Sequence, residues 1–131
     1  MNVWGKKSYK EYLGCHPDLQ WLLDELLQDV DISIIQGHRG KEEQNYYFDI
    51  GTSKVRWPYG SHNSNPSRAV DIQPHPRPSS EINMAPALGY IAGRAVEIGK
   101  KRNLEVIWGG DWNHNGDLTD QSFDDLFHLE I

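Results

Sequence analysis

The segments of this sequence that favour β-strands are few and short, and this limits the fold more than any other feature. Four runs rich in β-branched, aromatic or apolar residues predict strands, at residues 31–36, 69–72, 104–108 and 126–131. Helices interleave with these strands, but long loops make several of the connections. This arrangement favours an α+β fold over a doubly wound parallel sheet. We predict a short, largely antiparallel sheet with helices packed on it.

Three segments carry the patterns of helices. Apolar residues recur at the i, i+3, i+4, i+7 spacing over residues 17–30, with a proline suited to the first turn. Residues 41–50 predict a second helix, which a glycine would end. The longest helix is predicted over residues 83–102, where Pro86 is acceptable only in the first turn. The proline-rich run that begins at Pro74 is expected to form neither a helix nor a central strand.

The overall composition excludes several classes of protein. The 131 residues suffice for one domain, residues 1–131, with a sizeable core. A net charge of −6 disfavours broad electrostatic binding to nucleic acid or an anionic membrane. No run approaches the roughly 20 apolar residues of a membrane helix, and the first residues lack the apolar core of a signal peptide, so we expect synthesis in the cytoplasm. The single cysteine, Cys15, excludes an internal disulfide and a multi-cysteine metal site, and we expect it to be buried.

An imidazole and a carboxylate flank one irregular polar loop. His62 lies nine residues before Asp71, which belongs to the predicted strand at 69–72. Near the C-terminus, Asp125 lies three residues before His128. Two histidines and one aspartate can fill three corners of a zinc tetrahedron and leave the fourth for water, as catalytic zinc sites do. Spacing alone is weak evidence, because six histidines make chance pairings with acids common.

These four residues belong to a wider set of short motifs. The motifs are Cys15-His16-Pro17-Asp18-Leu19, Gly37-His38-Arg39-Gly40 followed by Gln44, Ser61-His62, Pro66-Ser67-x-Ala69-Val70-Asp71, Gly109-Gly110-Asp111-Trp112 and Asp125-x-x-His128-x-Glu130. Together they resemble the zinc D-alanyl-D-alanine carboxypeptidase and L-alanyl-D-glutamate endopeptidase superfamily, and in particular its small phage endolysin branch. In the wider superfamily the spacing between histidine and aspartate is often two residues shorter, and the longer loop here matches the endolysin branch.

The resemblance implies that His62, Asp71 and His128 are zinc ligands and that Asp125 is the general base. Zinc lowers the pKa of its bound water from 15.7 toward about 7 and polarises a scissile carbonyl. A carboxylate near that water can take its proton and pass it to the leaving amine. In an extended strand, positions three apart point to opposite faces. We therefore expect Asp125 to precede the last strand, in a turn.

Three further residues are candidates for binding the substrate. Arg39 follows a predicted strand and a glycine, where a guanidinium can project into a cleft. The resemblance implies that this arginine binds substrate, and its planar fork suits a peptide carboxylate or a developing oxyanion. A surface ion pair with Glu42 or Glu43 is the alternative. Gln44 and Ser61 are candidates for substrate contacts or for supporting the metal ligands.

A loop near the C-terminus resembles the first half of an EF-hand calcium loop. Oxygen-bearing side chains occupy its first, third and fifth positions, and a glycine occupies the sixth. Ser122 stands at the twelfth position, which is acidic in EF-hands. Calcium binding and a plain polar turn are both open, and a bound ion would order the nearby base and third zinc ligand. The candidate calcium ligands are Asp111, Asn113, Asn115, Asp117 and Asp120.

The resemblance implies a zinc metallopeptidase that hydrolyses the stem peptide of bacterial peptidoglycan, with the L-Ala–D-Glu bond as the favoured target. As a phage or prophage lysin, we expect a monomer that acts on the cell wall from the periplasm after release by a separate phage holin. It would bind neither nucleic acid nor the membrane interior. A D-Ala-D-Ala carboxypeptidase or dipeptidase is one alternative. A zinc-binding pseudoenzyme that recognises partners is another, although a recognition module has no need of Asp125.

Overall fold

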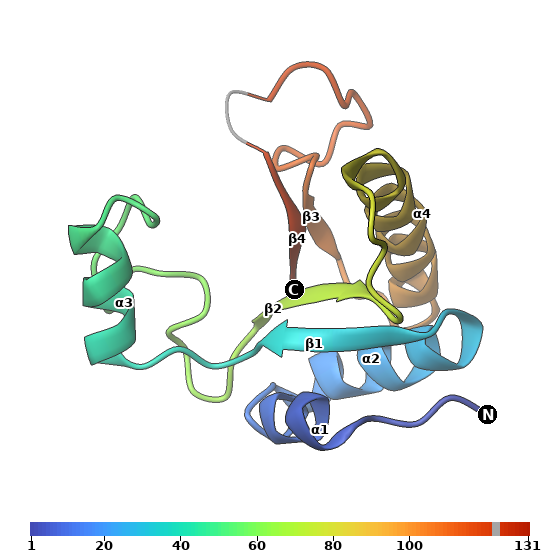
Figure 1. Ribbon diagram of the computed structural model, residues 1–131, viewed down its shortest axis with the longest axis horizontal. Helices are drawn as coiled ribbons and strands as arrows, with labels where there is room; N and C mark the ends of the chain where they lie inside the picture. Colours follow the sequence, from blue (N-terminus) through green and yellow to red (C-terminus); the bar gives the residue numbers. More distant parts are fainter. Residues whose placement is uncertain (122–123) are drawn as a thin grey trace.

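The computed structural model describes residues 1–121 and 124–131. Its described residues form four α-helices, one 3₁₀-helix and one four-stranded sheet (Figure 1). In chain order the elements are α1 (Lys6–Leu13), α2 (Pro17–Asp29), β1 (Ile32–Gln36), α3 (Lys41–Asp49), β2 (Ala69–Pro74), α4 (Glu81–Gly99), η1 (Lys100–Arg102), β3 (Ile107–Gly109) and β4 (Asp125–Glu130). Among these helices, none is both long and apolar enough to cross a membrane.

The sheet confirms the predicted α+β fold. Its strand order is β1-β2-β4-β3, and all three strand pairs are antiparallel. The two central strands therefore come from distant parts of the chain, and Asp71 of β2 is the register partner of His128 in β4. Helix α3 lies at the end of the molecule opposite α4, beside the long loop that leads into β2 (Figure 1).

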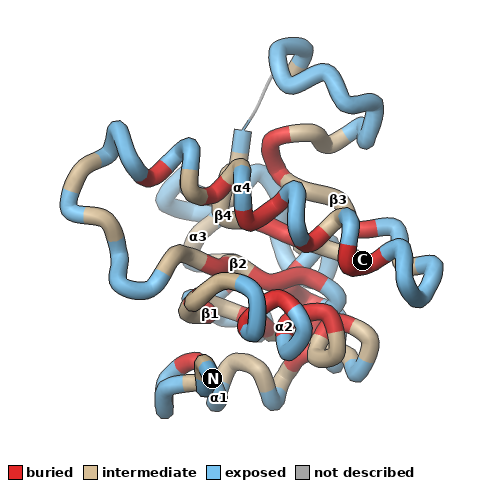
Figure 2. The backbone as a smooth tube through the Cα atoms, turned by 90° about the vertical axis from the view of Figure 1, so that its right-hand side faces the viewer, coloured by how far each residue is buried: buried red, intermediate tan, exposed pale blue. Residues whose placement is uncertain are grey.

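The hydrophobic core lies between one face of the sheet and the helices α2 and α4. Buried leucines of α2 and small or branched residues of α4 form one cluster with apolar residues of the strands. Figure 2 shows buried stretches along α2, α4 and β2. Neighbouring side chains of a strand point to opposite faces. Val70 and Ile72 belong to the core cluster, as does Leu129. Asp71 and His128, which alternate with these residues, consequently face the other side of the sheet.

Helix α1 is not among the predicted elements, and three further differences concern α4, β2 and β3. Helix α4 begins at Glu81, where Ser80 accepts a hydrogen bond from the backbone N–H of Ile82, so Pro86 lies beyond the first turn and that expectation is wrong. Pro86 is exposed, and the carbonyl that its missing N–H leaves unpaired can therefore reach water. Strand β2 extends through Pro74, which pairs only with β1, and a proline is tolerated where one side of the ladder ends.

The third difference is the length of β3, which begins at Ile107 rather than at residue 104. Asn103 has a left-handed φ of 56°, and the backbone N–H of Leu104 donates to the carbonyl of Gly99. This reversal turns the chain after α4, and pairing with β4 starts only at Ile107. The buried position of Cys15, by contrast, is confirmed: its side chain is 2% exposed, and burial raises the pKa of its thiol to about 11.

Candidate metal centre

Two strands and one loop bring His62, Asp71 and His128 together. Asp71 and His128 face each other across the central strands β2 and β4. His62 lies in the loop before β2 and is only 4% exposed. Its Nδ1 lies 2.8 Å from the carbonyl oxygen of Gly37, the residue that follows β1. The backbone carbonyl at the end of β1 therefore holds the imidazole of His62 in place.

The three side chains converge on one point. Oδ1 of Asp71 lies 3.4 Å from Nε2 of His62 and 3.3 Å from Nδ1 of His128. One ligand atom from each residue lies within 4.8 Å of the other two, as a group that could hold a metal ion. Oδ1 is buried and has no hydrogen-bond partner among the described residues. A buried carboxylate oxygen without a hydrogen bond is costly, and a bound cation would remove that cost.

Hydrogen bonds orient both imidazoles so that one nitrogen of each faces this point. A carbonyl oxygen can only accept, so Nδ1 of His62 donates to Gly37 and Nε2 is left for a ligand bond. Nε2 of His128 lies 2.8 Å from Oε1 of Glu130, so Nδ1 of His128 is left for a ligand bond. Metal-binding histidines are commonly held by such a carbonyl or carboxylate on the second nitrogen. The donor set of two nitrogens and one oxygen therefore fits a divalent metal.

The charges of the site favour a cation even without a metal. Burial alone would raise the pKa of Asp71, but the adjacent imidazoles of His128 and His62 lower it well below its usual range. Burial likewise opposes the charged form of His128, yet Asp71 and Glu130 raise its pKa to about 9. In the metal-free protein, a protonated His128 is therefore stabilised between the carboxylates of Asp71 and Glu130, and its Nδ1 proton lies where a metal ion would bind.

Asp125 is the first residue of β4, not part of a turn before the strand, so that detail of the prediction is wrong. Its Oδ2 lies 4.0 Å from Nδ1 of His128. The pairing with β3 is irregular: Trp108 pairs with Leu129, but Gly109 pairs with Asp125. Moving by one residue along β3 thus corresponds to moving by four residues along β4. Because the strand is irregular here, the rule that side chains three positions apart point to opposite faces does not apply to Asp125 and His128.

Gly109 is required at this irregularity. A Cβ atom at that position would collide with the backbone carbonyl of Asp125. The close approach brings the carboxyl group of Asp125 beside the three converging side chains. There, burial and the charge of Asp71 raise its pKa. A raised pKa suits a carboxylate that must take up a proton near neutral pH.

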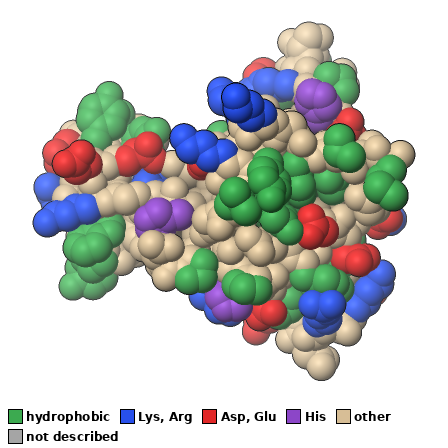
Figure 3. Space-filling model, turned by 90° about the horizontal axis from the view of Figure 1, so that it is seen from below, with side chains coloured by type: hydrophobic (Ala, Val, Ile, Leu, Met, Phe, Trp, Pro, Cys, Tyr) green, Lys and Arg blue, Asp and Glu red, His purple; other side chains and the backbone are tan. Residues whose placement is uncertain are grey.

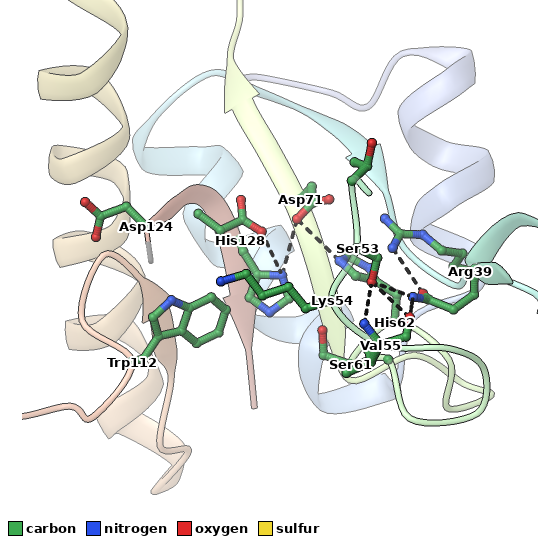
Figure 4. Close-up of a pocket in the computed structure, with 14 residues that line it drawn as sticks. Arg39, Ser53, Lys54, Val55, Ser61, His62, Asp71, Trp112, Asp124 and His128 are labelled. Carbon is green, nitrogen blue, oxygen red and sulfur yellow. Dashed lines mark hydrogen bonds and ion pairs between the residues drawn. The ribbon is translucent and has the colours of Figure 1, made fainter. Parts of the chain in front are cut away.

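A cavity of about 460 Å³ opens onto these residues (Figure 4). Its wall combines the sheet, the start of α3 and the loop between α3 and β2. Every residue singled out for the zinc site and the substrate lines this cavity, namely Arg39, Gln44, Ser61, His62, Asp71, Asp125 and His128. The structure therefore brings the predicted set into one place.

Arg39 is held at the cavity wall by several contacts. Its Nε and Nη2 donate to Oε1 of Gln36 over 2.9 and 2.6 Å, and its Nη1 donates to Gln44 over 3.1 Å. The guanidinium also lies 4.8 Å from the ring centroid of Tyr47. An ion pair with Glu43 at 3.8 Å, the alternative considered above, is present as well. A guanidinium fixed in this way is ordered before any substrate binds.

Gln44 is 1% exposed and engages its whole amide within the protein. Its Nε2 donates to Ser53 Oγ and to the carbonyl of Val55, each over 2.8 Å. Its Oε1 accepts from Arg39 and from Asn63 Nδ2. Both protons and both lone pairs are thus used. Gln44 joins the arginine to the cavity loop, whereas Ser61 is exposed at the rim.

Three residues of the site had no role in the sequence-based prediction, namely Glu130, Lys54 and Trp112. Glu130 could have been found, because positions two apart in a strand share a face and His128 is two residues before it. Lys54 and Trp112 line the cavity too, and the Trp112 ring lies 5.1 Å from that of His128 (Figure 4). Trp112 belongs to the motif Gly109-Gly110-Asp111-Trp112 but had no predicted role. No local pattern signals Lys54, which reaches the site only through tertiary packing.

The candidate calcium loop is ordered by its own hydrogen bonds. The Asp111 carboxylate accepts from the backbone N–H groups of Asn115 and Gly116, over 3.3 and 2.9 Å. Asp120 accepts from the side chains of Asn113 and Asn115. Asp117 accepts from Thr119, and Ser122 lies outside the described residues. In the described part of the chain, the acids of this loop form no cluster comparable to that of His62, Asp71 and His128. Calcium binding stays a prediction.

The chain is similar to known proteins in both sequence and structure. Residues 2–131 match the model of a family described as phage L-alanyl-D-glutamate peptidase. The fold is similar to the crystal structure of the Serratia marcescens L-Ala D-Glu endopeptidase ChiX, with a TM-score of 0.75 and 22% sequence identity. The alignment covers 96% of this chain and 86% of that one. A comparison with curated protein sequences finds no match.

Proposed function

The chain belongs to the phage L-alanyl-D-glutamate peptidase family, and on this premise we propose that it is a zinc-dependent endopeptidase that cuts the L-Ala–D-Glu bond of the peptidoglycan stem peptide. One observation carries the proposal. The buried Oδ1 of Asp71, which accepts no hydrogen bond among the described residues, converges with Nε2 of His62 and Nδ1 of His128 at the cavity.

His62 Nε2, Asp71 Oδ1 and His128 Nδ1 would hold the metal. Two imidazoles and one carboxylate are a donor set typical of catalytic zinc, and the open side of the cavity leaves room for water and substrate. When bound, zinc supplies Lewis acidity that polarises the scissile carbonyl and makes water more acidic. Gly37 and Glu130 fix the two imidazoles through their second nitrogens, which keeps the ligand atoms in place.

We assign the general base to Asp125. Its carboxylate lies at the cavity wall near the ligand cluster, with Oδ2 4.0 Å from His128 Nδ1. From there it would accept a proton from the attacking water and deliver that proton to the leaving amine of D-Glu. Its raised pKa, caused by burial and by the charge of Asp71, supports both transfers.

Arg39 and Ser61 would bind the substrate, and Gln44 would position Arg39. The guanidinium of Arg39 already lies at the wall, held by Gln36 and Gln44, so little ordering is needed when a carboxylate or oxyanion arrives. Ser61 is exposed at the rim directly before the ligand His62. Its hydroxyl can donate to, or accept from, the peptide backbone of the substrate.

The place of action follows from the family and the substrate. A phage peptidase made in the host cytoplasm reaches the wall only across the inner membrane, so we propose release through a separate holin and action in the periplasm, as a monomer. Calcium is proposed to bind the loop of Asp111, Asn113, Asn115, Asp117 and Asp120. Because this loop precedes β4, a bound ion would stabilise the start of the strand that carries Asp125 and His128.

Product analysis tests this function. The zinc-loaded protein should release fragments with new N-terminal D-Glu from purified Gram-negative peptidoglycan, and an EDTA-treated sample should not. Free D-Ala in place of these fragments would identify a carboxypeptidase. No product, with zinc shown to be bound, would leave a recognition module as the better account.

A further inference from the structure

Two exposed aromatic side chains lie on a loop whose two ends line the metal cavity. Trp57 is 39% exposed and Tyr59 is 82% exposed. They lie on the loop between Val55 and Gly60. Val55 and Gly60 line the cavity. The space-filling view from below shows hydrophobic side chains on the surface of the α3 end of the molecule (Figure 3). Exposed aromatic groups next to a functional cleft commonly mark a binding surface.

The loop that carries these rings is fixed by side chains of α3. Gln44 holds the carbonyl of Val55, and Asn45 Oδ1 accepts from the backbone N–H of Trp57 over 3.0 Å. Asp49 pairs with Arg56 over 2.9 Å. These contacts involve three successive residues of the loop, Val55, Arg56 and Trp57, so this segment is held before a ligand arrives.

Gly60, at the end of the loop, is also closely packed. A Cβ at Gly60 would lie 2.6 Å from both Asn63 Oδ1 and Gln44 Oε1. The backbone N–H of Gly60 donates to Asn63 Oδ1 over 2.8 Å. Tyr59 is therefore attached directly to a residue packed against the buried amide of Gln44. Its ring nevertheless projects to solvent, so its exposure does not come from a loose chain end.

We propose that Trp57 and Tyr59 form a platform for the glycan strand of peptidoglycan. This proposal rests on the proposed function, because it takes the L-Ala–D-Glu bond as the target. L-Ala is joined by an amide bond to the lactyl group of N-acetylmuramic acid, so the sugar is separated from the scissile bond by one residue. One residue spans about 3.5 Å. A peptide cut at the metal therefore brings its sugar close to the cavity and to the loops that line it.

The chemistry of the rim suits a sugar. The C–H faces of a pyranose ring pack against the flat face of an aromatic ring, while its hydroxyl groups stay hydrated or bind polar neighbours. Trp57 and Tyr59 supply the rings, and the Tyr59 hydroxyl and the exposed Ser61 supply polar groups. Lys41 Nζ, 5.6 Å from the Trp57 ring centroid, adds a further donor beside it.

The test compares two substrates that differ in the glycan, and the amine of the free peptide is acylated with lactate so that the amide before L-Ala is kept. One is a soluble glycan strand that carries stem peptides, and the other is the same stem peptide released from its sugar. The variants are Trp57→Ala, Tyr59→Ala and the double variant. Tyr90→Ala is the matched control, because Tyr90 is 59% exposed on α4 at the other end of the molecule (Figure 1).

We expect kcat/KM of the double variant to fall about tenfold or more on the glycan-bearing substrate, mainly through KM, and to change less than about twofold on the free peptide. Tyr90→Ala should match the wild type on both. Peptide-free glycan strands should inhibit the wild type competitively and the double variant about tenfold less. Equal losses on both substrates, or no loss on either, would overturn the platform. A wild-type protein that cuts neither substrate would instead refute the proposed function.

Discussion

Asp71 and His128 are register partners on neighbouring antiparallel strands, and Oδ1 of Asp71 lies 3.3 Å from Nδ1 of His128. Two of the three candidate ligands are therefore placed by backbone pairing, on the sheet face opposite the core residues Val70 and Leu129. His62 is the exception, since it comes from a loop and depends on its hydrogen bond to Gly37. The geometry of the site is thus built largely into the sheet.

Glu130→Gln should weaken metal binding without removing the metal ligands. The variant loses the carboxylate 2.8 Å from His128 Nε2, which makes the imidazole a better ligand. Loss of such a partner typically costs about 10–100-fold in metal affinity. Competition with a zinc-binding dye measures the change, and activity at saturating zinc should largely recover. Glu105→Gln, an exposed glutamate outside the cavity, serves as the control. Unchanged affinity would show that Glu130 plays no part.

Asp125→Ala should abolish catalysis and keep the metal. General acid–base groups contribute about 10²–10⁴-fold, so kcat should fall by that factor while zinc content stays at the wild-type level. Asp124→Ala removes a neighbouring carboxylate of the same cavity and should have a much smaller effect. A variant that degrades peptidoglycan as fast as the wild type would refute the role given to Asp125.

The metal-free protein should lose stability as the pH rises from 6.5 to above 9. The folded state raises the pKa of His128 from 6.5 to about 9, despite its burial, because Asp71 and Glu130 favour the imidazolium. Such a group contributes stability that is complete below its unfolded pKa and lost as the pH passes its folded pKa. The shift corresponds to a loss on the order of 3 kcal/mol.

Urea unfolding of the metal-free protein at pH 6.5 and 9.5 measures this loss. His128→Gln should remove most of this pH dependence of the free energy of unfolding. The variant thereby separates the contribution of His128 from that of groups that titrate elsewhere in the chain. The zinc-bound protein should not show it, because the metal replaces the proton on Nδ1. A free energy of unfolding that stays constant or increases over this range would contradict the prediction.

Calcium should raise the melting temperature of the zinc-loaded protein by several degrees if the loop of Asp111 binds it, because a ligand that binds only the folded state stabilises it. The protein is first treated with a chelator and reloaded with zinc. Asp111→Ala should abolish the response to calcium, and magnesium should give a smaller one. If calcium changes neither activity nor melting temperature, the loop is a polar turn.

Much of the fold and site could be predicted because the signals are local. The leucine pattern of α2 and the apolar run around Asp71 specify a helix and a buried strand by periodicity alone. The motifs that carry His62 and His128 supplied the ligand set through their resemblance to a known superfamily. The antiparallel sheet followed from short strands joined by loops.

The remaining features depend on contacts between distant segments. The position of Asp125 within β4 depends on the irregular pairing with Gly109, which no single segment encodes. The placement of Lys54 and Trp112 at the cavity depends on how two loops pack against the sheet. The role of Gln44 emerges only when its partners Arg39 and Val55 are seen together.

Titration of the metal-free protein with zinc tests the central claim most directly. Bound zinc and the rate of peptidoglycan hydrolysis are measured on the same samples, for the wild type and for Asp71→Ala. We predict a rate that is absent without metal, rises in proportion to bound zinc and levels off at about one ion per chain. Asp71→Ala should neither retain zinc nor hydrolyse peptidoglycan. Full activity of the metal-free protein, or of Asp71→Ala, would contradict the account.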